Sequence, residues 1–244
     1  MKNTIPLVVA CTILSGCSTT SSQDIELLQA KVKDLETNQR IIASRIQMDG
    51  VTGTPDSIDF DDGIAFGSPK APIAMIEFTD IQCPYCAQFQ EETFPEFKDK
   101  YIDTGKVYYV AREMPLGSIH PKAFSAAVAL RCAAEQDKAV YESMKVDLFK
   151  QRNELSEQVY LDTATSYALD TQKFSSCVSD KDTQKSVENS YKYAISIGIK
   201  STPSFVFGHN TGSSAADYKI GSGAMSLEQI ENALALFSEE ENQK

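Results

Sequence analysis

Two cysteines separated by two residues are the strongest chemical signal in the sequence. Cys83 and Cys86 flank Pro84 and Tyr85 in a C-x-x-C motif, a spacing that suits the reversible formation of a disulfide. An apolar, β-prone run over 73–78 precedes the motif and predicts a buried strand, and a helical pattern follows the motif. The motif is therefore predicted to lie where a strand turns into a helix.

The start of a helix changes the chemistry of a thiol placed there. Unpaired N–H groups and the helix dipole favour a negative charge, which lowers the pKa of the first cysteine. Pro84 suits the first helical turn, where its missing N–H costs little. We therefore predict that Cys83 is an exposed attacking thiolate. Cys86, one turn inward, is predicted to be the resolving thiol that closes the disulfide or releases a mixed disulfide with substrate.

Two other uses of a C-x-x-C motif are less favoured here. A structural zinc site needs four ligands, usually in two close pairs, but Cys132 and Cys177 are 45 residues apart, and His120 and His209 are the only histidines. A purely structural disulfide is the second alternative, and the strand–motif–helix context favours redox chemistry over it. We expect neither a metal ion nor a nucleotide.

A second element of interest lies far along the chain. Residues 198–207 join a helical pattern to a short apolar strand through Thr202 and Pro203. A proline that opens a strand is compatible with a sheet, and an X-Pro bond can be cis in a tight turn. The sequence does not decide between cis and trans.

These motifs together resemble the thioredoxin superfamily. The resemblance rests on Glu77-Phe78, the C-x-x-C motif and the run Ser201-Thr-Pro-Ser-Phe205. The mostly helical stretch between the motif and Thr202 resembles the DsbA-type thiol–disulfide interchange proteins, and the likeness covers about 66–237. It implies an α/β fold: a thioredoxin-like mixed sheet with a helical insertion.

The resemblance also implies roles for individual residues. A proline before the last strands lies against the active-site disulfide and helps to bind substrate backbone, and an acid six positions before the first cysteine assists proton transfer. The active-site disulfide itself is then the redox cofactor. Carried over in this way are the catalytic residues Cys83, Cys86 and Glu77 and the substrate-binding residues Pro84, Tyr85, Thr202 and Pro203.

The direction of the reaction stays open at this stage. The dipeptide between the cysteines is Pro-Tyr rather than the Pro-His of strongly oxidising members, and the chain has no Trp. Thr202 before the proline is common among isomerase-like members, whereas the DsbA-like architecture favours an oxidase. Either direction requires a membrane redox partner that reoxidises or reduces the dithiol.

The N-terminus reads as a targeting segment. One lysine precedes an apolar stretch over 5–14, which is too short to span a bilayer, and Leu14-Ser-Gly-Cys17 resembles a lipoprotein signal. We expect residues 1–16 to be a signal peptide and Cys17 to carry a lipid anchor. Ser18 favours the outer membrane, with the protein facing the periplasm. The alternative is an ordinary signal peptide cleaved nearby.

A short coiled coil is predicted after the lipidated tether of 17–24. Apolar residues recur over 25–48 with alternating spacings of three and four, which is typical of a heptad seam. This seam favours a homo-oligomer, dimer or trimer, over a helix folded back on its own domain. The seam comprises Ile25, Leu28, Val32, Leu35, Gln39, Ile42 and Ile46.

The rest of the chain is predicted to be a linker and one domain. Residues 49–63 are predicted to be a linker, because 50–56 combine Gly, Thr and Pro55, and Asp59–Asp62 are predicted to be solvated charge. Residues 64–238 form the thioredoxin-like domain, with a helical insertion at about 116–197. In an oxidising compartment Cys132 and Cys177 favour a structural disulfide between two insertion helices, and two buried free cysteines are the alternative.

The charge of the chain narrows the choice of partners. The chain has 244 residues and a net charge of −11, which argues against nucleic acid. The sequence predicts a thiol–disulfide oxidoreductase that acts on cysteines of proteins outside the cytoplasm. The alternative is a non-catalytic envelope lipoprotein whose thioredoxin-like domain binds a partner protein.

Overall fold

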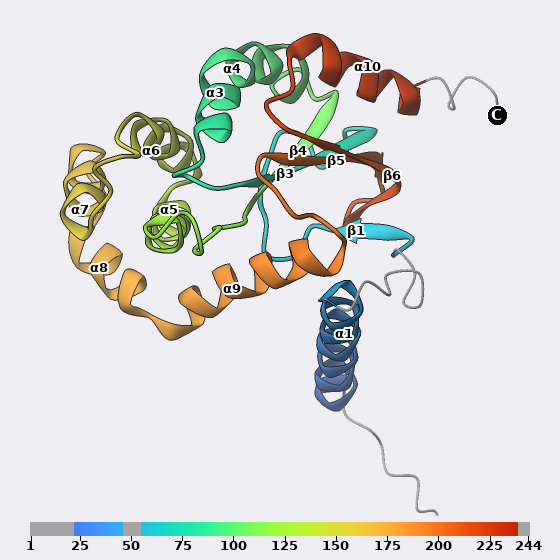
Figure 1. Cartoon of the computed structure of the whole chain (residues 1–244), viewed down its shortest axis with the longest axis horizontal. Coiled ribbons are helices and arrows are strands. Elements are labelled where there is room, and N and C mark those ends of the chain that lie inside the picture. Colours follow the sequence, from blue (N-terminus) through green and yellow to red (C-terminus); the bar gives the residue numbers. More distant parts are fainter. Residues whose placement is uncertain (1–21, 46–54, 239–244) are drawn as a thin grey trace, which may run out of the picture. The chain divides into compact units, whose positions relative to one another are not determined.

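The computed structural model describes residues 22–45 and 55–238, and Figure 1 shows their helices and strands. The chain divides into two units, residues 1–36 and 37–244, which are described separately. The predicted signal peptide, Cys17, most of the tether and residues 49–54 of the predicted linker lie outside the described residues. Among the helices that the structure describes, none has the length and apolar character needed to cross a membrane.

Helix α1 (Ser22–Arg45) confirms the predicted N-terminal helix, although residues 46–48 of the predicted coiled coil are not described. Its apolar seam is exposed to solvent. Each apolar residue of the seam in the described helix has more than two fifths of its surface exposed: Ile25, Leu28, Val32, Leu35 and Ile42. Whether this helix associates with a second copy stays a prediction.

Six strands form one mixed sheet in the order β1-β6-β5-β3-β4-β2. Strands β3 and β4 run parallel, and every other neighbouring pair is antiparallel. Strand β3 is central and all seven of its residues are buried, which explains its mostly apolar sequence. The strands are β1 (Ser57–Asp59), β2 (Ile64–Phe66), β3 (Ile73–Thr79), β4 (Val107–Glu113), β5 (Ser204–Asn210) and β6 (Ser214–Ser222).

Helices cover both faces of this sheet (Figure 1). Met75 of β3 packs in a core cluster with Phe89 of α3 and Phe237 of α10, whereas the neighbouring Ile76 packs in a second cluster with Ala194 of α9. This alternation follows from the two-residue period of a strand. The helices of the first face include α3 (Pro84–Glu92), α4 (Phe94–Phe97) and α10 (Leu227–Ser238).

The predicted helical insertion lies between β4 and β5 and contains five α-helices. Three of them begin at a residue whose side chain accepts the first N–H groups of the helix, namely Asp137, Ser156 and Asp170. A fourth begins in the same way at Asp180. The helices are α5 (Ala123–Gln136), α6 (Lys138–Lys150), α7 (Glu157–Ser166), α8 (Thr171–Ser179) and α9 (Lys181–Ser196).

The helix that follows the C-x-x-C motif is broken just before Pro95, a residue at which the sequence predicts a kink. Helix α3 ends at Glu92 and α4 begins at Phe94, after which one π-helical turn covers Lys98–Ile102. A proline has no N–H to donate, and its ring collides with the carbonyl four residues earlier. The helix that carries the C-x-x-C motif is therefore only nine residues long.

The interpretation of 49–63 as linker is wrong for its second half. Strand β1 pairs with β6, so the sheet begins at Ser57 rather than after residue 63. Asp59 is not simply solvated charge, because its carboxylate lies 3.4 Å from the guanidinium of the buried Arg112 and its N–H donates to the Tyr193 hydroxyl. A strand of three residues is too short to show a periodicity in the sequence.

Candidate active site

The C-x-x-C motif lies at the turn between β3 and α3, as predicted. Cys83 is the N-cap residue of α3, with extended backbone angles (φ −71°, ψ 122°), and Pro84 is the first helical residue. The Cys83 N–H donates to the Asp80 carbonyl at 3.0 Å, and the Cys83 carbonyl accepts the Ala87 N–H at 3.1 Å. The backbone of the turn thus fixes where the first sulfur can lie.

The segment before β5 lies against the first sulfur. The Thr202–Pro203 peptide bond is cis, which the sequence left undecided. The Cys83 thiol donates to the Thr202 carbonyl at 3.3 Å, so residues 119 positions apart in the chain are in contact. The Pro203 carbonyl in turn accepts the Gly223 N–H at 2.9 Å, which holds this segment to the end of β6.

The two thiols have opposite acidities. The pKa of Cys83 is lowered to about 6, chiefly by a hydrogen bond from the Cys86 side chain, with further donation from Thr202 and from backbone N–H groups at the helix start. Burial raises the pKa of Cys86 well above its usual value, and the neighbouring Cys83 adds to the rise. At neutral pH the pair is therefore a Cys83 thiolate next to a protonated Cys86 thiol.

The expected exposure of Cys83 is wrong. Only 4% of its surface is accessible, and Cys86 is fully buried. The reason is the contact with Thr202, because the segment before β5 covers the sulfur from the side that a helix terminus alone would leave open. Tyr85, between the two cysteines, is by contrast 62% exposed.

Glu77 lies in β3 below the motif and is fully buried. Its Oε2 accepts hydrogen bonds from the Tyr109 hydroxyl and from Lys145 Nζ, the latter at 2.9 Å. Its Oε1 has no hydrogen-bond partner within the described part of the chain. The structure therefore gives this carboxylate a buried cation from α6, which sequence reasoning missed.

The sequence of α6 gives little sign that Lys145 is buried. A lysine in an amphipathic helix is normally taken to face solvent, yet only 3% of this side chain is exposed. Its neighbours Met144 and Leu148 are buried as well, and this apolar context is the one signal that could have identified the position. The helical insertion is thus tied to the central strand through an ion pair as well as through apolar packing.

Comparison with known proteins identifies the family. Residues 60–225 match the family model described as Thioredoxin. The chain belongs to the thioredoxin family.

Solved structures of DsbA-type proteins are similar to this thioredoxin-family chain. It is similar to α-DsbA1 of Wolbachia pipientis, with 26% identity and a TM-score of 0.66 over 75% of this chain and 94% of that one. It is also similar in fold to BdbD of Bacillus subtilis, with 19% identity and a TM-score of 0.61 over 76% of this chain and 100% of that one.

Curated relatives are longer than the matched region. The chain is 28% identical to a putative protein-disulfide oxidoreductase of Rickettsia felis over 64% of its own length and 57% of the relative. It is 29% identical to the Na(+)/H(+) antiporter NhaA 3 of Salinispora tropica over 64% of its own length and 23% of that protein. The chain thus spans less than two thirds of each of these relatives.

The first prediction concerns Thr202, whose hydroxyl oxygen is buried and bonds to no described group while Cys83 is a thiol. The Thr202 side chain favours the thiolate, so Thr202→Val is expected to raise the pKa of Cys83 by about 1 unit from its value of about 6. Titration of the thiolate absorbance in the reduced protein measures this shift. Thr202→Ser keeps the hydroxyl and is the matched control. An unchanged midpoint in the valine variant would contradict the assignment.

The same titration has a consequence for stability. The pKa of Cys83 is lower in the folded protein than its usual value of 9.0, so the thiolate stabilises the folded, reduced state. As the pH rises from about 6 to about 9, the free energy of unfolding of the reduced protein should therefore increase. On acidification through pH 6 this stabilisation should be lost. The free energy of unfolding of Thr202→Val should increase less over the same pH range.

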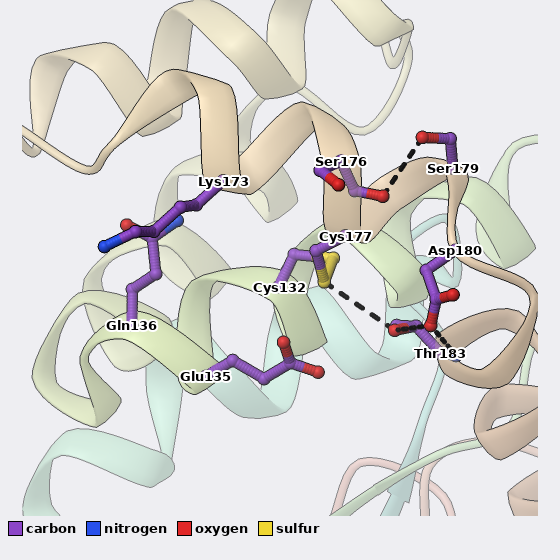
Figure 2. A pocket seen from close by; sticks show the side chains of 9 residues that line it. All are labelled: Cys132, Glu135, Gln136, Lys173, Ser176, Cys177, Ser179, Asp180 and Thr183. Carbon is purple, nitrogen blue, oxygen red and sulfur yellow. Dashed lines mark hydrogen bonds between the residues drawn. A yellow bond between two sulfur atoms is a disulfide. The ribbon is translucent and has the colours of Figure 1, made fainter.

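A second disulfide lies in the helical insertion. Cys132 of α5 and Cys177 of α8 are bonded, with their Cα atoms 5.7 Å apart, so the predicted bond is present. Figure 2 shows the disulfide beside a pocket lined by side chains of α5, α8 and the start of α9, with Thr183 next to the Cys177 sulfur. Since none of the lining residues belongs to the C-x-x-C motif, this bond is separate from the active site.

Loss of this disulfide is expected to affect stability rather than chemistry. Closing a loop of 45 residues contributes about 3–4 kcal/mol through the entropy of the unfolded chain, so the double variant Cys132→Ala/Cys177→Ala should lose about that much. Urea unfolding of the wild type and the double variant measures the difference. The pKa of Cys83 should not change. A double variant as stable as the wild type would show that the bond has no stabilising role.

Proposed function

We propose that the chain is a protein thiol–disulfide oxidoreductase that acts on cysteines of proteins outside the cytoplasm. The observation that carries the proposal is the Cys83–Cys86 pair, in which a thiol of low pKa lies beside a buried thiol of high pKa, under a cis Thr202–Pro203 bond. A structural cysteine pair needs no such difference in acidity.

The chemistry is a pair of exchange steps. In the oxidised enzyme a substrate thiolate attacks the Cys83 sulfur, the Cys83–Cys86 bond breaks, and Cys86 leaves as a thiolate that takes up a proton. A second substrate thiolate then attacks the mixed disulfide on its substrate sulfur, and Cys83 leaves as a thiolate. The low pKa of Cys83 makes it a good leaving group. The reverse sequence reduces or isomerises a substrate disulfide.

The remaining site residues have supporting roles in this proposal. Thr202 and Pro203 shape the groove for substrate backbone, and Pro84 and the exposed Tyr85 contribute to substrate binding. Glu77 assists the proton transfer at Cys86. Its position two residues before Thr79, whose side chain lowers the pKa of Cys86, supports this role.

Two assays test the activity. Wild-type protein is expected to catalyse the reduction of insulin by a small thiol or the refolding of scrambled ribonuclease, and Cys83→Ser should abolish both. The matched control is Cys132→Ala/Cys177→Ala, which removes two cysteines away from the site and should retain turnover. No turnover in either assay with both active-site thiols intact would favour the alternative, a partner-binding lipoprotein.

The redox state of the dithiol in the native cell envelope shows the direction of exchange. A membrane redox partner keeps the dithiol of an oxidase oxidised, and a different partner keeps the dithiol of an isomerase or reductase reduced. Alkylation after acid quenching, followed by a mobility-shift gel, distinguishes the two states of Cys83 and Cys86. The same gel identifies the class of partner that the enzyme uses.

We further propose that Cys17 anchors the protein by a lipid, at the outer membrane facing the periplasm. The lipoprotein-like sequence up to Cys17 supports this location. Cys17→Ala, or inhibition of the lipoprotein signal peptidase with globomycin, should then release the protein from the membrane fraction. Unchanged partitioning would exclude the anchor.

The exposed seam of α1 supports a homo-oligomer through residues 25–48. Five apolar side chains along one helix are exposed, and burying them against a second copy removes that surface from water. Light scattering should give a dimer or trimer for the chain from residue 18 and a monomer for the chain from residue 49. A monomer in both cases would exclude the coiled coil.

A further inference from the structure

Asp80, three residues before Cys83, connects the active-site turn to the segment that follows β4. Its carboxylate is fully buried. Oδ1 accepts the Gln82 N–H at 2.8 Å within the turn, whereas Oδ2 accepts the Leu116 N–H at 2.8 Å and lies 2.8 Å from Nδ1 of His120. Since a carboxylate can only accept, Nδ1 of His120 carries the proton in this contact.

The main chain of the same residue reaches both cysteines. The Asp80 carbonyl accepts the Cys83 N–H, and the Asp80 backbone favours the Cys86 thiolate and lowers the pKa of Cys86 against the larger effect of burial. Any displacement of Asp80 therefore changes the surroundings of both thiols at once.

The segment 116–122 is itself well anchored. The His120 N–H donates to the Leu116 carbonyl at 2.9 Å, and the His120 carbonyl accepts the Ala123 N–H at 3.1 Å at the start of α5. Two residues further, the Lys122 N–H donates to the side chain of Gln82. The segment is thus bound to the active-site turn at Leu116, His120 and Lys122.

His120 precedes Pro121 and a helical run, and this position predicts a capping or surface residue. Its geometry is not that of a surface residue. Only 17% of its side chain is exposed, and its ring faces a carboxylate that has no access to water. A buried carboxylate is costly unless hydrogen bonds or a cation compensate it. Within the described residues, His120 is the side chain that supplies this compensation to Oδ2 of Asp80.

We propose that Asp80 and His120 are positioning residues for the active-site dithiol. By holding the segment 116–122 against the turn, the pair determines how the N–H groups of the turn face the sulfurs of Cys83 and Cys86. The helical insertion thereby acts on the dithiol without contacting the substrate. This inference rests on the proposed function, because a positioned dithiol matters only if the thiols react.

Replacement of His120 tests the pair. His120→Leu removes the donor, which leaves the Asp80 charge less compensated and releases the turn, and both effects disfavour the Cys83 thiolate. The titration midpoint of Cys83 should rise by about half a pH unit from about 6, which is about a threefold lower thiolate fraction at pH 5. His120→Asn places an amide N–H close to the position of Nδ1 and should restore the wild-type midpoint.

The control is Ser118→Ala, an exposed position in the same segment, which should leave the midpoint unchanged. A lower melting temperature in His120→Leu with an unchanged midpoint would show a purely structural pair and overturn the proposal. If His120→Leu does not fold, the same titration is carried out on His120→Gln, whose amide reaches the position of Nε2 rather than that of Nδ1. A raised midpoint of Cys83 in this variant supports the proposal, and an unchanged midpoint refutes it. Because the titration uses reduced protein without substrate, failure of this inference is distinguishable from absence of turnover in the insulin assay.

Discussion

Cys86→Ala is expected to accumulate mixed disulfides between Cys83 and substrate proteins. In the proposed reaction Cys86 is the buried thiol that resolves such an intermediate, and its high pKa keeps it protonated until exchange occurs. Without it, the bond formed at Cys83 persists until an external thiol arrives, so turnover should fall by at least about a hundredfold. Acid-quenched cells separated on non-reducing gels should show high-mass adducts of the variant that disappear on reduction.

The adducts of this variant also test the assignment of the attacking cysteine. The double variant Cys83→Ala/Cys86→Ala should form none, because Cys132 and Cys177 are bonded to each other. Mass spectrometry of the adducts identifies the substrates directly. Adducts that persist in the double variant, or their absence from Cys86→Ala, would contradict the roles given to the two cysteines.

Lys145→Met is expected to have the largest effect on stability. The substitution leaves the buried Glu77 carboxylate without its cation, and removing one partner of a buried ion pair costs about 3–5 kcal/mol. The methionine approximately fills the volume of the lysine stem, so the loss reports on the charge rather than on a cavity. Urea unfolding of the oxidised protein at pH 7 measures the change in the free energy of unfolding.

The matched control is the double variant Glu77→Gln/Lys145→Met, which removes both charges and keeps a partner for the Tyr109 hydroxyl. It should be clearly more stable than Lys145→Met alone. A loss of less than about 1 kcal/mol in Lys145→Met would mean that water reaches Glu77 and that the ion pair does not hold the insertion to the sheet.

The central part of the fold and the dithiol could be predicted from the sequence because their signals are local. A mostly apolar, β-prone run indicated β3, and the C-x-x-C motif with Pro84 indicated the start of α3. The bond between Cys132 and Cys177 followed from the number of cysteines left in an oxidising compartment. Each of these signals lies within a short segment or in a simple count.

The features that could not be predicted depend on contacts between distant segments. Strand β1 exists because β6 offers it a partner, and three residues show no period of their own. Lys145 is buried because α6 packs over Glu77, and the low exposure of Cys83 results from Thr202 lying over its sulfur. The pairing of Asp80 with His120 likewise requires the segment after β4 to return to the motif.

The limited access to Cys83 affects how its thiolate would withstand oxidation in the compartment proposed for the protein. A cysteine ionised at neutral pH reacts readily with peroxide, and further oxidation to the sulfinic acid is irreversible in most proteins. Here only 4% of the Cys83 surface is accessible, and its sulfur lies within hydrogen-bonding reach of Cys86. A sulfenic acid formed on Cys83 would therefore condense with the Cys86 thiol, which releases water and gives the Cys83–Cys86 disulfide. This disulfide is also the oxidised form in the proposed catalytic cycle. The first oxidative damage to Cys83 is thus converted into the normal oxidised form of the site.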